Sequence, residues 1–520
     1  MPTDGIYLRR LAGLLPALAV AALLAGPAAA EQQNACHGGF LNIGYVADAV
    51  GLDPHLTTAQ NSELMFQFAY SGLLKIDDKM QILPDIATSW QVSEDGLTYT
   101  FDLRDNVKFH NGRLMTADDV IYSLQRIIDA GTPFSARLDN IASMRAVGND
   151  VVEIVLKERF APFLSVLATV KAAIVPREEV EKHGDLQNVM VGTGPYKFVE
   201  YKPGTSLRLE KNPDYYDPDL PYLDGLEIKV IPDEVTRVAA LRSGQIDFAA
   251  LGDPLSLRII ESDSSAKTLT VPMLQRNVLV LNVNQAPLDD VRVRQAIAVA
   301  VDRQEVVDLG LGGFGQVSGP FPDGLAAWAL PRSEIPFYDE APNLEKAKAL
   351  LAEAGYPDGF TLQTYAAPQY ASHIPVAEVL QQQLARIGIK MDIQVIEWGV
   401  LLKNWSSNNF ASISMTYAGR SDPYYYTYER LHSKSPGNAS RLADAEIDRL
   451  SEEGMELTSP EERKAVYDKL QVRMAETSAI IYLATTSEFF AMRKSVEGFK
   501  GMPDSSRGYL ANVWLNTACN

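Results

Sequence analysis

The amino-acid sequence predicts an α/β protein that divides into more than one folding unit. Strand-like and helix-like segments follow one another along the whole chain, with no low-complexity tract and no clear internal repeat. The chain has 520 residues, of which 46% are hydrophobic and 22% charged, so it is long enough to bury more than one core. A disordered or collagen-like polymer is excluded.

The first thirty residues predict a cleaved secretory signal. Arg9 and Arg10 precede an apolar run over residues 11–25, and residues 28–30 are the small alanines that signal peptidase accepts. The apolar run is shorter than the roughly 20 residues that span a bilayer, which disfavours a membrane anchor. A twin-arginine signal is a less favoured alternative. Because no cysteine follows the run directly, we expect a soluble mature protein without a lipid anchor.

Several segments of the mature chain predict strands. Residues 97–103 (LTYTFDL) alternate apolar and polar side chains, as a half-buried strand does. Residues 151–156, 226–231 and 278–283 are rich in β-branched and other apolar residues and predict further strands.

Capping residues predict the helices between them. Thr116, with Asp119 three residues later, opens a helix over residues 117–129, and Ser459 opens another with Pro460 at its first position. Further signals mark a helix from Asn343 to Gly355, one from Pro375 to Gly388, and an alternating strand over residues 389–396.

Charge and cysteine content exclude some function classes. Lys and Arg number 47 against 66 Asp and Glu, and the formal net charge of −19 argues against a nucleic-acid clamp. Cys36 and Cys519 are the only cysteines, too few for a disulfide scaffold or a cysteine-built zinc site. One bond joining the two ends can form outside the cytosol.

Motifs for catalysis and cofactor binding are lacking. Residues 310–315 (GLGGFG) match a dinucleotide fingerprint, but they follow a helical segment where the fingerprint needs a strand. The six histidines are scattered without the spacing of a metal site. Neither a nucleophile elbow nor a phosphate-binding loop is present. We therefore expect no enzyme activity, no cofactor and no metal.

Four signatures, in the right order, resemble the dipeptide and oligopeptide (family 5) solute-binding proteins of bacterial ABC importers. They are residues 84–127 (from PDIATSW to YSLQRI), 191–198 (VGTGPYKF), 226–248 (LEIKVIPDEVTRVAALRSGQIDF) and 287–307 (PLDDVRVRQAIAVAVDRQEVV). Residues 338–360 and 381–403 fit the same pattern, so the likeness covers nearly the whole mature chain.

The resemblance implies a three-lobed periplasmic binding protein-like fold of type II, the Venus-flytrap kind, with a discontinuous first lobe. Lobe I would comprise residues 31–69, 199–274 and 489–520; lobe II, residues 70–198; and lobe III, residues 275–488. Both mature ends then fall in lobe I, which would let Cys36 and Cys519 pair.

The resemblance also implies a function. The protein would reside in the periplasm, capture a peptide or related small solute in the cleft between its lobes, and deliver it to an ABC permease in the inner membrane. Closure of the lobes over the solute would be the delivery signal. A monomer that binds no nucleic acid is expected.

The ligand-binding pattern of the family changes at one point in this sequence. Peptide-binding members capture the ligand's amino terminus with an aspartate in an aromatic-x-x-Asp run, and here the matching position is Arg420, after Tyr417. A guanidinium repels an ammonium and suits carboxylate or phosphate. Asp422 can replace the missing carboxylate, but Asp422-Pro423 is equally a turn and helix start.

The predicted pocket includes aromatic walls and polar groups from the first lobe, a composition typical of ligand clefts. Its predicted members are Tyr417, Arg420, Asp422, Tyr370, Trp398, Gln60 and Asn61. The alternatives are a receptor for a non-peptide anionic solute such as an opine or sugar-phosphate conjugate, a metal-chelate receptor with His432 as the nearby imidazole, and an extracytoplasmic hydrolase or chaperone on the same scaffold.

Overall fold

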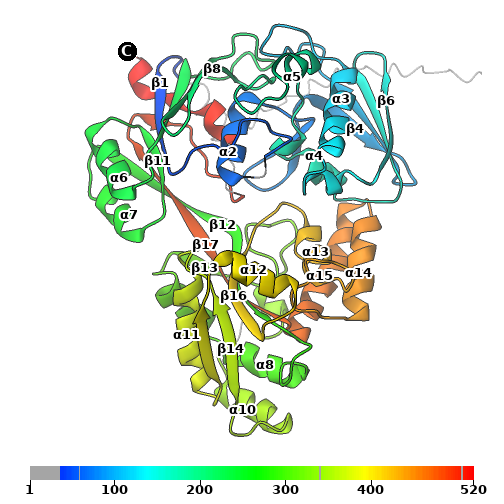
Figure 1. The fold of residues 1–520 in the computed structure, drawn as a ribbon, viewed down its shortest axis with the longest axis vertical. Helices are drawn as coiled ribbons and strands as arrows, with labels where there is room; N and C mark the ends of the chain where they lie inside the picture. Colours follow the sequence, from blue (N-terminus) through cyan, green and yellow to red (C-terminus); the bar gives the residue numbers. More distant parts are fainter. Residues whose placement is uncertain (1–34, 58, 339–340, 505–507, 520) are drawn as a thin grey trace, which may run out of the picture.

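The computed structural model describes residues 35–57, 59–338, 341–504 and 508–519. The predicted signal, residues 1–30, lies outside the described residues. Within these ranges, no helix is both long and apolar enough to cross a bilayer. The chain forms an upper and a lower body, which two long strands join (Figure 1).

One large mixed sheet extends through both bodies. Its strands, in the order in which they pair, are β15 (Lys390–Val395), β14 (Thr361–Ala366), β16 (Ser412–Tyr417), β12 (Ala266–Leu281), β17 (Ile480–Arg493), β11 (Phe248–Leu251), β1 (Phe40–Tyr45), β10 (Gly225–Val230), β9 (Ser206–Lys211) and β8 (Tyr196–Lys202), with β13 (Gly315–Val317) also paired to β17.

The long strands β12 and β17 form the connection between the bodies. They pair antiparallel, and their register shifts between Pro272 and Arg276 of β12. Proline has no N–H to donate to the ladder, and so the pairing is interrupted close to where the strands leave one body for the other. The sequence predicted β12 only over its last residues, from 278 onward; the structure extends this strand back to Ala266.

A separate four-stranded antiparallel sheet lies in the upper body. Its order is β4 (Ala87–Val92), β5 (Thr98–Leu103), β7 (Val151–Leu156) and β6 (Ile141–Val147). β5 and β7 confirm the strands predicted at 97–103 and 151–156. Two short pairs, β2 (Leu74–Ile76) with β3 (Ile82–Pro84) and β18 (Val496–Glu497) with β19 (Trp514–Leu515), complete the β structure of the described residues.

The helices cover the sheets. In the upper body they are α2 (Gln60–Ala69), α3 (Ala117–Asp129), α4 (Phe163–Leu167), α5 (Arg177–His183), α6 (Glu234–Ser243) and α7 (Pro254–Glu261). In the lower body they are α8 (Val291–Ala300), α9 (Arg303–Glu305), α10 (Leu344–Glu353), α11 (His373–Ala385), α12 (Trp398–Ser406), α13 (Tyr428–Leu431), α14 (Ala445–Glu456) and α15 (Pro460–Thr477).

The predicted caps are present. The Asp119 carboxylate accepts a hydrogen bond from the Thr116 N–H at 2.9 Å, and Asn343 accepts one from the Lys346 N–H at 2.9 Å. Ser459 caps α15 through the Glu462 N–H at 3.3 Å. Helix α11 begins at His373, two residues before the predicted start at Pro375.

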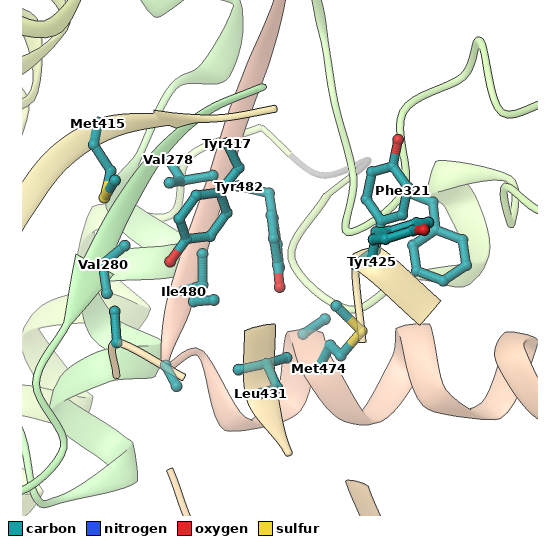
Figure 2. Close-up of a cluster of buried hydrophobic side chains, with 14 of the residues drawn as sticks. Val278, Val280, Phe321, Met415, Tyr417, Tyr425, Leu431, Met474, Ile480 and Tyr482 are labelled. Carbon is teal, nitrogen blue, oxygen red and sulfur yellow. The ribbon is translucent and has the colours of Figure 1, made fainter. Parts of the chain in front are cut away.

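Separate hydrophobic clusters fill the two bodies. One is built almost wholly from residues 73–174, while two others take nearly all their residues from 274–483. Figure 2 shows part of one lower-body cluster, in which Tyr417 and Tyr482 project beside Val278, with Leu431 and Met474 below them. Each body therefore has its own core.

A disulfide joins the two ends of the described chain. Cys36 and Cys519 are bonded, with their Cα atoms 5.2 Å apart, and the bond closes a loop of 483 residues. The pairing of Cys36 with Cys519 that the resemblance implied is therefore present in the structure.

Candidate ligand-binding site

A cavity of about 680 Å³ lies between the upper and lower bodies. Segments far apart in the sequence line it: α2 and residues 134–137 from the upper body, and α12 and the end of β16 from the lower body. Met273 and Gln275, at the interruption in β12, also line it. The cavity thus lies against the strands on which the bodies would move.

One face of α2 forms part of the upper wall. Gln60, Glu63, Leu64 and Gln67 line the cavity, and their spacing of three and four residues places them on one side of a helix. Asn61 does not line it, because one residue along a helix is a turn of about 100°. Of the two first-lobe residues predicted for the pocket, the structure brings only Gln60 to it.

Aromatic side chains form the facing wall. Trp398, Leu402 and Trp405 lie on one face of α12, again at spacings of four and three residues, and all three line the cavity. Tyr370 meets Trp398 edge to face, with 5.1 Å between ring centroids. Trp405 and Leu402 were absent from the prediction, although the helical spacing in WGVLLKNW could have indicated them.

His373 supports this wall from behind. Its ring stacks on Tyr370 at 4.8 Å, and its Nε2 accepts a hydrogen bond from the Thr416 N–H at 3.1 Å. That nitrogen therefore carries no proton. Burial lowers the pKa of His373 to about 4, so the imidazole is neutral near pH 7.

Tyr417, at the end of β16, and Arg420, in the loop that follows, both line the cavity. Tyr417 is buried, and the Arg430 guanidinium lies 4.5 Å from its ring centroid. Burial raises the pKa of the Tyr417 hydroxyl. Arg420 is held through its backbone: its N–H donates to the Tyr426 hydroxyl at 2.9 Å, and that hydroxyl donates to the Arg420 carbonyl at 2.7 Å.

Asp422 has a structural position outside the cavity lining. Its carboxylate accepts hydrogen bonds from the Arg463 guanidinium at 3.0 and 3.1 Å and from the Tyr424 N–H at 2.9 Å. Only 5% of Asp422 is exposed. The turn-and-helix-start interpretation of Asp422-Pro423 therefore fits this residue, whose carboxylate is paired inside the protein and does not line the cavity.

Cations that the sequence did not single out also line the cavity. They include Arg137, Lys171 and Arg430. The Arg137 guanidinium lies over the Tyr425 ring and the Arg430 guanidinium over the Tyr417 ring, while Lys171 pairs with Glu63 at 2.6 Å. Arg137 and Lys171 come from short helical turns and Arg430 from α13, where no local motif marks them. Only the tertiary fold brings them together.

His432, the imidazole considered for a metal chelate, does not line the cavity. It is fully buried, and its Nε2 lies 3.1 Å from Glu452 Oε1 while its ring stacks on Tyr428 at 4.1 Å. Among the described residues, no group of three or more His, Cys, Asp or Glu is placed to hold a metal ion.

Comparisons with known proteins agree with this geometry. The family model described as "Bacterial extracellular solute-binding proteins, family 5 Middle" matches residues 81–438. The heme-binding protein A of Haemophilus influenzae is 31% identical over 455 residues, which cover 81% of this chain and 82% of that protein. The probable di/tripeptide-binding protein 5 of Pseudomonas aeruginosa is 30% identical over 520 residues, covering 92% and 95%.

A solved structure shows the same fold. The ABC transporter substrate-binding protein CtaP from Listeria monocytogenes superposes with a TM-score of 0.83 at 26% identity, over 92% of this chain and 99% of that one. The expected type II binding-protein fold is confirmed.

Proposed function

This chain belongs to the bacterial extracellular solute-binding proteins of family 5 and is a substrate-binding protein of an ABC transporter, and we propose that it captures a peptide or related small solute in the cavity between its bodies. The cavity itself carries this proposal. Its volume of about 680 Å³ suits a small organic ligand, and its wall combines aromatic surface with a few charged groups.

We propose a division into three lobes that keeps nearly all residues of the two lower-body clusters within lobe III. Lobe I comprises residues 31–69, 199–274 and 489–520, lobe II residues 70–198 and lobe III residues 275–488. The boundaries of lobe III fall within β12 and β17, next to the directly paired residues Val271 and Glu488. A hinge there lets two rigid parts approach without breaking either core.

Ligand binding shifts the equilibrium between the open and the closed arrangement of the lobes. A ligand that touches α2 above and α12 below has more contacts when the lobes are together, so it favours the closed state by the difference in its affinities. The closed form is then presented to the permease. Family members are substrate-binding proteins, and we propose that the ligand leaves chemically unchanged.

The proposed receptor role also bears on where the protein acts and on its oligomeric state. We propose that residues 1–30 direct export and that the mature protein acts in the periplasm as a monomer. A net charge of −19 makes nucleic acid an unsuitable partner.

Native mass spectrometry of the mature protein, purified without denaturation, tests this function. The expected spectrum shows one small molecule per protein, which is recovered with unchanged mass after incubation with fresh protein. Release of a cleaved or modified product would indicate an enzyme, and protein that retains no small molecule and takes up none from a periplasmic extract would contradict the receptor role.

A further inference from the structure

The cavity is cationic, although the protein as a whole is strongly acidic. Its lining has five basic and three acidic side chains, while the chain carries a net charge of −19. The basic residues are Lys75, Arg137, Lys171, Arg420 and Arg430, and the acidic ones are Glu63, Asp85 and Asp504. Field lines from such a cleft concentrate anions.

The acidic side chains already have partners within the protein. Glu63 pairs with Lys171 at 2.6 Å. Asp85 accepts a hydrogen bond from the Tyr216 hydroxyl at 2.6 Å and lies 3.7 Å from Lys75. Asp504 also interacts with another part of the chain. A ligand ammonium at Glu63 or Asp85 would therefore have to share the carboxylate with a lysine that already neutralises it.

Arg420 is placed differently. Among the described residues, no acidic side chain lies within ion-pair distance of its guanidinium, whose one hydrogen bond is a 3.4 Å contact from Nη1 to the neighbouring Gly419 carbonyl. Its backbone is fixed twice by Tyr426. The side chain therefore offers a planar fork of donors at a fixed place in the wall.

A buried positive charge lies against Tyr426, the residue whose hydroxyl holds the Arg420 backbone. Arg276 is 1% exposed, and its guanidinium lies 4.3 Å from the ring centroid of Tyr426 and 5.2 Å from that of Tyr482. It donates to the Pro320 carbonyl and has no acidic partner in the described part of the chain. A buried charge is weakly screened, so Arg276 adds to the positive potential of this wall.

Arg430 is the third cation of this region, and it shares its counter-ion with Arg137. Its guanidinium lies 3.2 Å from Glu429, whose other oxygen is 4.0 Å from Arg137. Among the described residues, Glu429 is the only carboxylate within ion-pair distance of Arg276, Arg420 or Arg430, and it also lies close to Arg137. We name Arg276, Arg420 and Arg430 the arginine wall.

We propose that the ligand carries two or more acidic groups, that one of them binds Arg420 on the arginine wall, and that the ligand needs no free ammonium group. This inference rests on the proposed receptor function. It narrows the ligand class to small polyanions such as acidic peptides with a blocked amino terminus, other N-acylated acidic compounds or related dicarboxylates.

Four dipeptides test the acidic side chains and the free amino group of the ligand separately. They are Glu-Glu, N-acetyl-Glu-Glu, Gln-Gln and N-acetyl-Gln-Gln, and each is titrated into cargo-free mature protein in a calorimeter. We expect N-acetyl-Glu-Glu to bind at least as tightly as Glu-Glu, and both to bind at least 10-fold more tightly than either glutamine peptide. The proposal is overturned by a 10-fold loss on acetylation, by equal affinity for Gln-Gln, or by the absence of binding to every probe.

Substitutions at Arg420 and at a control arginine test whether the acidic ligand binds at Arg420. Arg420→Gln should lower the affinity for N-acetyl-Glu-Glu at least 10-fold, and Arg420→Lys, which keeps the charge but not the fork, should lower it less. Arg386→Gln removes the same charge from a residue outside the cavity lining and should change the affinity less than twofold. Equal losses for Arg420→Gln and Arg386→Gln would refute a site at Arg420. Native mass spectrometry of each variant reports separately whether the receptor function survives.

Discussion

At the scale of single residues, the burial of Asp422 indicates a structural role for its carboxylate. Its carboxylate and the Arg463 guanidinium form a buried pair beside the cavity and not in it. Because Asp422→Asn leaves a buried guanidinium without its counter-ion, we expect it to lower the free energy of unfolding by about 3–5 kcal/mol in urea. Binding of the retained cargo should be unchanged in the folded variant. A large loss of affinity with normal stability would instead assign Asp422 to the ligand.

The folded protein should lose stability in mild acid because of three buried histidines. Burial lowers the pKa values of His55, His110 and His373 to about 4, while the unfolded chain titrates near 6.5. The unfolded state therefore binds more protons between these pH values. The free energy of unfolding should be level above about pH 6.5 and fall below it, by up to about 1.4 kcal/mol per pH unit for each histidine.

Urea unfolding at pH 7.5, 6 and 5 measures this slope. His55→Gln should flatten it, whereas His183→Gln, at an exposed position on α5, should leave it as it is. A stability that does not change between pH 7 and 5 would contradict the neutral, buried state of these imidazoles.

Residue-level prediction from the sequence worked where the signal is local. Trp398, Tyr417 and Arg420 stand in short segments that the family likeness marks, and Tyr370 was predicted as an aromatic wall. All four line the cavity, and their contact with a ligand stays a prediction. Arg137 and Lys171 come from segments with no local signature and reach the cavity only through the packing of whole lobes.

At the scale of elements, contacts between the upper and lower bodies stabilise the observed arrangement. Phe160 meets Tyr424 edge to face at 5.4 Å, and the Ala161 N–H donates to the Met455 carbonyl at 2.7 Å. Arg137 adds a contact with the Tyr425 ring at 4.8 Å. These contacts connect Arg137 and residues 160–161 of the upper body to the turn after β16 and to α14 of the lower body, so they favour the state in which the cavity is enclosed.

Phe160→Ala should therefore weaken ligand binding although Phe160 does not line the cavity. Loss of one aromatic pair, worth about 1 kcal/mol, predicts a roughly fivefold lower affinity in calorimetry. Phe360→Ala is the matched control, because its edge-to-face partner Tyr356 lies within the same lobe. An affinity equal to that of the unaltered protein would show that this contact does not contribute to closure.

Elements with local signals were predicted well, and those built by distant pairing were not. Helices α3 and α10 begin at the caps that the sequence showed. The first half of β12 has no clear alternation and contains Pro272, so its pairing with β17, more than 200 residues away, was not visible in the sequence. The lobe boundaries at 274/275 and 488/489, which fall within these two strands, came from the family resemblance and stay a prediction.

At the scale of the whole molecule, the Cys36–Cys519 bond constrains the unfolded chain more than the folded one. In the chain-entropy model, a bond that closes a loop this long contributes about 4–5 kcal/mol. The double substitution Cys36→Ser and Cys519→Ser should lower the free energy of unfolding by about that amount and leave ligand affinity unchanged. Two free thiols in denatured, unreduced protein would remove the basis of this expectation.

The two bodies joined at β12 and β17 are proposed to close over a solute in the cavity between them. Small-angle X-ray scattering measures this directly, on mature protein freed of cargo by unfolding and refolding and on the same protein after its extracted small molecules are returned. We predict a smaller radius of gyration when the cavity is filled. Superimposable scattering curves, with binding shown by calorimetry in the same samples, would contradict the account.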